Sequence, residues 1–191
     1  MLISAFSDGF AALYPLGVLT TALVLWKFRA HYAVHSWRFS WQAVGIGVAV
    51  FVLWIVLEPP EDGSGHKLAA RLAAMPLWLS SLWLLFRVAG SVVTVPLAEE
   101  LAFRGYLIRK LVRNDFETVP PGYFTWFSLI VSSLMFGLLH ANWLAGIVAG
   151  AAFALALYRR GRISDAIVAH MTSNALIAAA ALGFGRWALW T

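Results

Sequence analysis

The chain has 191 residues, of which 61% are hydrophobic and 12% are charged. This composition excludes an ordinary soluble globule and predicts an all-α polytopic transmembrane helix bundle of about six to eight helices, a single integral membrane domain over residues 1–191. The formal net charge is +5, but the lysines and arginines cluster in short interhelical loops, so we expect no nucleic-acid partner. The chain has no cysteine, which excludes disulfides, thiol nucleophiles and thiolate metal sites.

The apolar stretches predict membrane spans, in chain order, at residues 9–26, 41–57, 124–140, 143–158 and 164–184. Residues 68–113 allow two arrangements. They form either two helices broken near Ala89-Gly90 or one bent, deeply inserted helix with Arg87 along it. The number of crossings in this part of the chain therefore stays open.

Two basic clusters, at residues 109–113 and 159–162, flank a pair of predicted spans. Because two crossings return the chain to the same side, both clusters should lie at one membrane face, and the excess of Lys and Arg predicts that this face is cytoplasmic. Trp187 and Trp190 fit an aromatic belt at the membrane interface.

The most informative motif is Glu99-Glu100-x-x-x-Arg104, which places three ionisable side chains in an apolar stretch. Each such group costs about 2.5 to 3.5 kcal/mol near the centre of a bilayer unless it is paired. Glu100 and Arg104 are four residues apart and can pair on one helix face, which alone would be explained by helix packing. Glu99 points about 100° away and has no local partner, which suits a general base.

Two further motifs are Phe136-x-x-x-His140 and His170-x-x-x-Asn174. Taken alone, His140 can be interfacial, and His170 with Asn174 can be interhelical hydrogen-bonding groups. At a rise of ~1.5 Å per residue, Glu99 lies roughly 15 to 20 Å from the basic face, His140 about 24 Å and His170 about 9 Å. A carboxylate, two imidazoles and a carboxamide in this slab suit water activation and oxyanion stabilisation.

Other hydrolytic centres are excluded by pattern. The chain has no His-Glu-x-x-His zinc motif and no Gly-x-Ser-x-Gly elbow. Its lysines lie at loops or helix ends and its four aspartates lie near span ends, which argues against a Ser-Lys dyad and a two-aspartate protease. What remains is a glutamate with histidines.

In order and on successive helices, Glu99-Glu100-Leu-Ala-Phe-Arg104, Phe136-Gly-Leu-Leu-His140 and His170-Met-Thr-Ser-Asn174 resemble the signature of the CAAX-protease and bacteriocin-processing (CPBP, or ABI) family. This family consists of intramembrane glutamate proteases of the Rce1 type. The resemblance covers about residues 88–185, the expected catalytic core. It extends to bacterial relatives associated with exosortase or exopolysaccharide loci.

The resemblance implies a role for each motif residue. Glu99 with His140 would polarise a water, His170 and Asn174 would donate to the oxyanion, and Glu100 and Arg104 would hold the motif helix, with Phe136 supporting the site. No cofactor or metal is required on this view, although Glu99, Glu100, His140 and His170 also have the chemistry of an oxygen and nitrogen metal site.

The expected substrate is a membrane-anchored or lipidated protein or peptide, and the expected location is a bacterial inner membrane. Two alternatives to a protease remain. One is a non-proteolytic binding, sorting or immunity protein that holds a peptide in the same polar cavity. The other is a small proton-coupled transporter, since intramembrane acids and histidines also serve proton relays.

Overall fold

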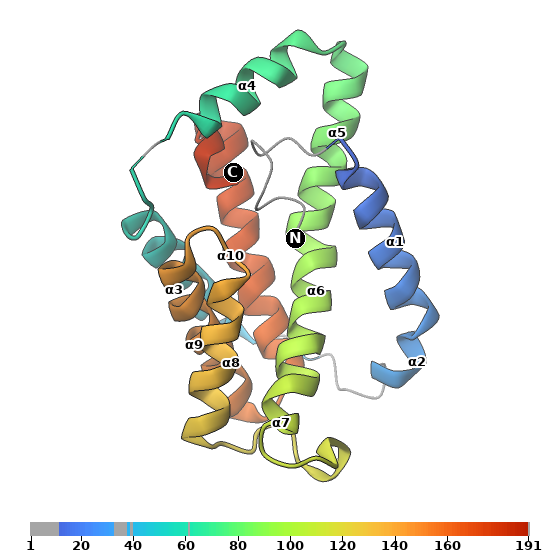
Figure 1. Cartoon of the computed structure of the whole chain (residues 1–191), viewed down its shortest axis with the longest axis vertical. Coiled ribbons are helices and arrows are strands. Elements are labelled where there is room, and N and C mark those ends of the chain that lie inside the picture. The colour runs from blue at the N-terminus through green and yellow to red at the C-terminus, as the bar shows by residue number, and fades with distance from the viewer. Residues whose placement is uncertain (1–11, 33–37, 39, 61, 191) are drawn as a thin grey trace.

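The computed structural model describes residues 12–32, 38, 40–60 and 62–190, and these residues form helices and connecting loops (Figure 1). Residues 9–11 of the predicted first span lie outside the described residues. The α-helices are α1 (Tyr14–Lys27), α2 (Arg29–Tyr32), α3 (Trp41–Val56), α4 (Ser64–Ala74), α5 (Leu77–Ala89), α6 (Val95–Glu100), α7 (Ile108–Lys110), α8 (Trp126–Leu138), α9 (Trp143–Arg160) and α10 (Ile163–Phe184). The all-α prediction is confirmed.

Helices α5, α6 and α7 are parts of one continuous helix of 34 residues, Leu77–Lys110. Two π-helical stretches, Gly90–Thr94 and Leu101–Leu107, join them. The helical structure is interrupted at Met75, earlier than either predicted arrangement assumes. The backbone of Met75 is extended, as is usual for a residue that precedes a proline, here Pro76. The stretch therefore crosses the bundle once.

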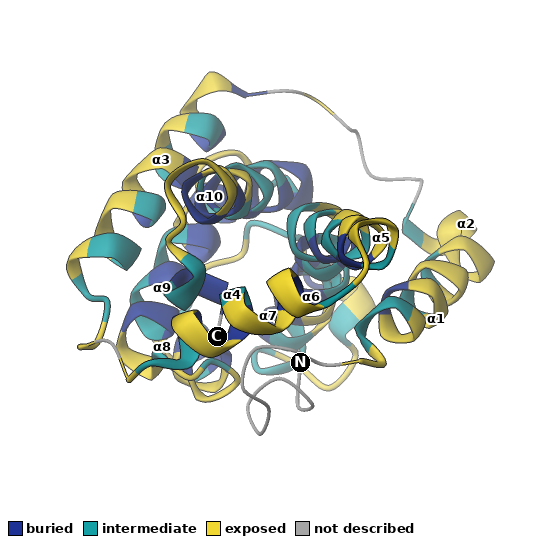
Figure 2. Cartoon of the chain, turned by 90° about the horizontal axis from the view of Figure 1, so that it is seen from above, coloured by how far each residue is buried: buried dark blue, intermediate teal, exposed yellow. Residues whose placement is uncertain are grey.

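Helix α10 lies at the centre of the bundle (Figure 2). It packs against α3 and α9 on one side and against the long helix on the other, while α8 packs against α9 and α1 flanks α5. The lower and middle parts of α10 and the long helix run side by side (Figure 1), which brings residues from both into contact. Two of the predicted site residues, Glu100 and His170, meet at this contact.

Small residues set how closely α8 and α9 approach. A Cβ added to Gly146 would lie 2.9 Å from the Cα of Gly137, and one added to Gly150 would lie 3.2 Å from the Cα of Ser133. The glycines of α9 therefore face α8 inside the bundle, as small residues do at membrane helix contacts.

The contact between α3 and α10 gives a stability prediction with a matched control two residues away. A Cβ on Gly47 would lie 2.4 Å from the carbonyl oxygen of Ala169, whereas one on Gly45 would meet nothing within 4 Å. Gly47→Ala is therefore expected to lower the free energy of unfolding by about 1 to 3 kcal/mol, because the backbone of α3 or α10 must move to make room for the methyl group. Gly45→Ala is expected to leave stability unchanged or slightly higher, because alanine favours a helix. Thermal unfolding in detergent measures both, and equal effects would contradict the packing.

Among the described residues, three helices are long and apolar enough to cross a membrane: Leu77–Lys110, Trp143–Arg160 and Ile163–Phe184. Two shorter apolar helices, Trp41–Val56 and Trp126–Leu138, accompany them. By length and composition, the described part of the chain can therefore cross a membrane.

The two basic clusters lie at the same end of the bundle, the lower end in Figure 1, as predicted. Gly122, in the loop after the first cluster, approaches Gly161 of the second, where an added Cβ would be 2.9 Å from the Gly161 Cα. Arg160 also donates to Gln42 at the start of α3. The loops at this end thus form one basic surface.

The expectation that Trp190 belongs to an interfacial belt is wrong. After Gly185, whose φ of 67° lets the chain turn, residues Trp187–Trp190 form a 3₁₀ turn that folds back on the bundle. Trp190 is 5% exposed and its carbonyl accepts a hydrogen bond from Arg87. Arg87 is itself buried, and its guanidinium lies 4.8 Å from the ring centre of Tyr14.

Candidate active site

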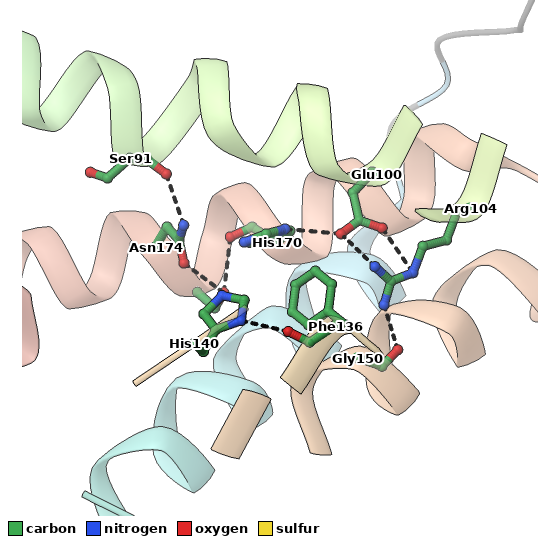
Figure 3. A network of polar contacts seen from close by, with 9 residues as sticks. Ser91, Glu100, Arg104, Phe136, His140, Gly150, His170 and Asn174 are labelled. Carbon is green, nitrogen blue, oxygen red and sulfur yellow. Dashed lines mark hydrogen bonds and ion pairs between the residues drawn. The ribbon is translucent and has the colours of Figure 1, made fainter. Parts of the chain in front are cut away.

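A buried ion pair between Glu100 and Arg104 anchors the site (Figure 3). Arg104 donates to the Oε1 of Glu100 at 3.2 Å, and its Nε lies 3.1 Å from Oε2, a charge contact whose angle is not that of a hydrogen bond. Arg104 also donates to the carbonyl of Gly150 at 2.5 Å. The predicted i,i+4 pair is present. The bond from Arg104 to Gly150 ties the long helix to α9.

His170 joins this ion pair from α10. Its Nδ1 lies 2.9 Å from Oε1 of Glu100, and both side chains are buried, at 4% and 0% exposed. Because a carboxylate only accepts hydrogen bonds, Nδ1 is the donor and Nε2 is the nitrogen left for other partners. Glu100 is thus shared between Arg104 and His170.

His140 lies just beyond the end of α8. Its Nδ1 is 2.8 Å from the carbonyl oxygen of Phe136, so that nitrogen carries the hydrogen and Nε2 has the lone pair in the neutral ring. The ring of Phe136 lies 4.7 Å from that of His140 and 5.8 Å from that of His170. Phe136 therefore contacts both imidazoles (Figure 3).

Asn174 lies one turn after His170 and reaches back to the long helix. Its amide nitrogen donates to the carbonyl oxygen of Ser91 at 2.8 Å. Ser91 belongs to the π-helical stretch Gly90–Thr94, where the usual α-helical bonding of the backbone is changed. The π-helix thus supplies the acceptor that holds Asn174, and the second N–H of the amide is left for another acceptor.

Glu99 is 8% exposed, and neither of its carboxylate oxygens has a hydrogen-bond partner among the residues that the structure describes. It lies in the last turn of α6, which follows the first π-helical stretch, next to the compensated Glu100. A buried carboxylate without a partner is expensive unless it has a chemical task or binds a ligand. This is the contrast between the two glutamates that the motif predicted.

Five of the predicted residues are joined by direct contacts. Glu100, Arg104 and His170 form one network, and Phe136 links it to His140 through its ring and its carbonyl. Asn174 bonds to the long helix rather than to His170. Within the described ranges, no group of three His, Asp or Glu side chains is placed to hold a metal ion.

Three groups that were not predicted from the sequence also contact the site. The ring of Phe153 stacks on His170, that of Trp54 lies 5.8 Å from His140, and the Gly150 carbonyl accepts from Arg104. Phe153 gives a weak signal as the one aromatic residue in the small-residue stretch 149–154. A backbone carbonyl leaves no signal in the sequence.

The arrangement contains the parts that hydrolysis of a carbonyl compound needs. An unpaired carboxylate and an imidazole with a free lone pair can take a proton from water. A second imidazole and an amide, each held by another group, can donate to a developing negative charge. All of them lie within an apolar bundle, where such contacts are strong.

Comparison with known families supports this chemistry. Residues 80–176, about half of the chain, match the family model described as type II CAAX prenyl endopeptidase Rce1-like. Comparisons with curated proteins and with solved structures gave no match. The matched residues run from α5 to α10 and include Glu99, Glu100, His140, His170 and Asn174. The chain therefore belongs to the Rce1-like family of membrane peptidases.

Proposed function

We propose that the protein is an intramembrane endopeptidase that hydrolyses a peptide bond of a membrane-anchored or lipidated protein or peptide, with Glu99 as the base. The observation that carries this proposal is the buried, unpartnered carboxylate of Glu99 beside a Glu100 that two partners already compensate. The Rce1-like match over the same residues supports peptidase chemistry.

The proposed reaction begins with a water between Glu99 and His140. As the water oxygen attacks the peptide carbonyl carbon, its proton passes to the Glu99 carboxylate, while Nε2 of His140 accepts a hydrogen bond from the same water. When the tetrahedral intermediate collapses, the C–N bond breaks and Glu99 returns the proton to the leaving amine. The products are a carboxylic acid and an amine, and the enzyme is unchanged; the acid then loses its proton to the amine or to water and becomes a carboxylate.

His170 and Asn174 are proposed to stabilise the oxyanion. Asn174 donates through the N–H that Ser91 does not use. His170 donates through Nε2 while Nδ1 stays bound to Glu100, which requires a ring protonated on both nitrogens, with Glu100 balancing its charge. In acyl-transfer enzymes, fixed donors of this kind often lower the activation barrier more than any other group in the site.

We propose that the basic surface at residues 109–113 and 159–162 faces the cytoplasm of a bacterial inner membrane, as the positive-inside rule predicts. Glu99 lies 11 residues before Lys110, the end of the long helix, which places it ~16 Å from this surface. The substrate bond would then be cut in the cytoplasmic half of the bilayer.

His140→Gln is expected to lower the rate of peptide cleavage at least about a hundredfold, because the glutamine amide oxygen is a weaker base than the imidazole nitrogen and holds the attacking water in a different position. The measurement is the initial rate with tagged, membrane-anchored peptides in liposomes. His31→Gln is the matched control, since His31 is exposed at the basic end and contacts Phe28. Its rate should equal that of the wild type.

The same assay separates the protease from the alternatives. Tight peptide binding without cleavage, unchanged by replacing Glu99, would instead establish a binding or sorting protein. Proton or solute flux into the liposomes that depends on Glu99, without cleavage, would establish a transporter. A His140→Gln variant that cleaves at the wild-type rate would remove His140 from the mechanism.

A further inference from the structure

Helix α9 carries none of the polar residues of the motifs, yet it contacts two groups of the site. The carbonyl of Gly150 accepts from Arg104. One turn later, the ring of Phe153 lies against the imidazole of His170, with ring centres 4.5 Å apart and planes at 16°. Phe153 is 1% exposed, so its ring is enclosed.

We propose that Phe153 is a positioning residue for His170. The face of its ring fixes the plane of the imidazole and thereby the direction in which Nε2 points. This inference rests on the proposed function, in which His170 donates from Nε2 to the oxyanion. It assigns a task in that reaction to a residue on a helix outside the three motifs.

The need for such a contact follows from how His170 is held. The hydrogen bond from Nδ1 to Oε1 of Glu100, 2.9 Å long, fixes one nitrogen but leaves the ring able to turn about that contact. Turning moves Nε2, which is on the far side of the ring. A nearly parallel aromatic ring on one face prevents this motion, because the imidazole would collide with it.

A second ring completes the enclosure. Phe136 meets His170 nearly edge to face, with centres 5.8 Å apart and planes at 70°. Phe136 also meets Phe153 at 84°, with centres 6.0 Å apart. The two phenylalanines thus brace each other and close two sides of the imidazole, while Glu100 holds a third.

Phe153 also lies beside the other partner of Glu100. The guanidinium of Arg104 is 5.7 Å from the centre of the Phe153 ring and 4.7 Å from that of Phe136. A cation near an aromatic ring is favourable, and more so away from water. One apolar wall therefore contacts both partners of Glu100, Arg104 and His170, and keeps that carboxylate between them.

The test replaces the ring by side chains without an aromatic face. Phe153→Leu is expected to lower kcat about ten- to a hundredfold with KM within about twofold, the loss expected when a catalytic group moves by about 1 Å. Phe153→Met, whose longer and more flexible side chain can adapt to the space, is expected to do the same. Phe153→Tyr keeps the stacked ring and should retain kcat within about threefold.

Phe103→Leu is the matched control. Phe103 is also buried, packs on Phe136 with centres 5.2 Å apart and lies 5.7 Å from the guanidinium of Arg104. In the part of the chain that the structure describes, its ring makes no contact with His170. Phe103→Leu should therefore lower thermal stability as Phe153→Leu does, while losing less than about threefold in kcat.

A spectroscopic measurement keeps this inference separate from the proposed function. In protein with ¹⁵N-labelled histidine, the side-chain signals of His170 are identified by their loss in His170→Gln. They should be sharp in the wild type and in Phe103→Leu, and broadened or shifted in Phe153→Leu and Phe153→Met.

The outcomes are distinct. If the wild type cleaves no peptide, the proposed function fails, while the His170 signals still test the positioning. If Phe153→Leu and Phe153→Met match Phe103→Leu in both kcat and the His170 signals, Phe153 only fills space and the inference is overturned.

Discussion

Glu99→Gln is expected to reduce peptide hydrolysis about a thousandfold while leaving the bundle folded. Glutamine has nearly the same shape as glutamate but cannot accept the proton of the attacking water, and removing a general base costs typically about 10² to 10⁴ in rate. The side chain contributes no hydrogen bond within the described structure, so its replacement breaks no such contact. Initial rates of cleavage of a membrane-anchored peptide measure the effect, and circular dichroism in detergent measures the fold.

Glu117→Gln is a suitable control for this change. Glu117 lies in the loop after the first basic cluster, away from the motif residues in the sequence, and its backbone carbonyl accepts a hydrogen bond from Arg109. This variant should cleave at the wild-type rate. If Glu99→Gln retained the wild-type rate as well, the base would have to be a different group.

Arg104→Met is expected to destabilise the protein by about 3 to 5 kcal/mol, the cost of removing one partner of a buried ion pair. Arg104 is 1% exposed and Glu100 is fully buried, so the loss leaves a carboxylate in an apolar surrounding with only His170 as partner. The Gly150 carbonyl also loses its donor. The free energy of unfolding in detergent, measured by titration with a denaturant, gives the size of the effect.

Two further variants show whether the buried charge is the cause. Adding Glu100→Gln to Arg104→Met removes the unpaired charge and should recover more than half of the lost stability. Arg186→Met breaks the ion pair with Glu58, in which Arg186 is 45% exposed, and should cost less than about 1 kcal/mol. Equal losses in Arg104→Met and Arg186→Met would show that burial does not strengthen the Glu100–Arg104 pair.

The sequence was most informative where an interaction is local. The Glu100–Arg104 pair follows from a spacing of four residues on a helix, and the structure contains it. The contact of His170 with Glu100 joins residues 70 apart in the chain. Its existence depends on how α10 packs against the long helix, which no local pattern encodes.

The break in the long apolar stretch shows how a local signal misleads. Gly90 marked one candidate break, yet the helix continues through it as a π-helical stretch. A Cβ at this position would lie 2.5 Å from the hydroxyl oxygen of Tyr14, so the glycine serves the close approach of α1. The helical structure is instead interrupted directly before Pro76, as a proline predicts.

The most direct test of a glutamate-activated water compares wild type and Glu99→Gln on one membrane-anchored peptide, with and without a strong chelator, in water enriched in ¹⁸O. Only the wild type should cleave, the chelator should change nothing, and mass spectrometry should find one ¹⁸O in the new carboxylate. Cleavage that persists in Glu99→Gln, or that stops when the chelator is added, would contradict a glutamate-activated water as the nucleophile.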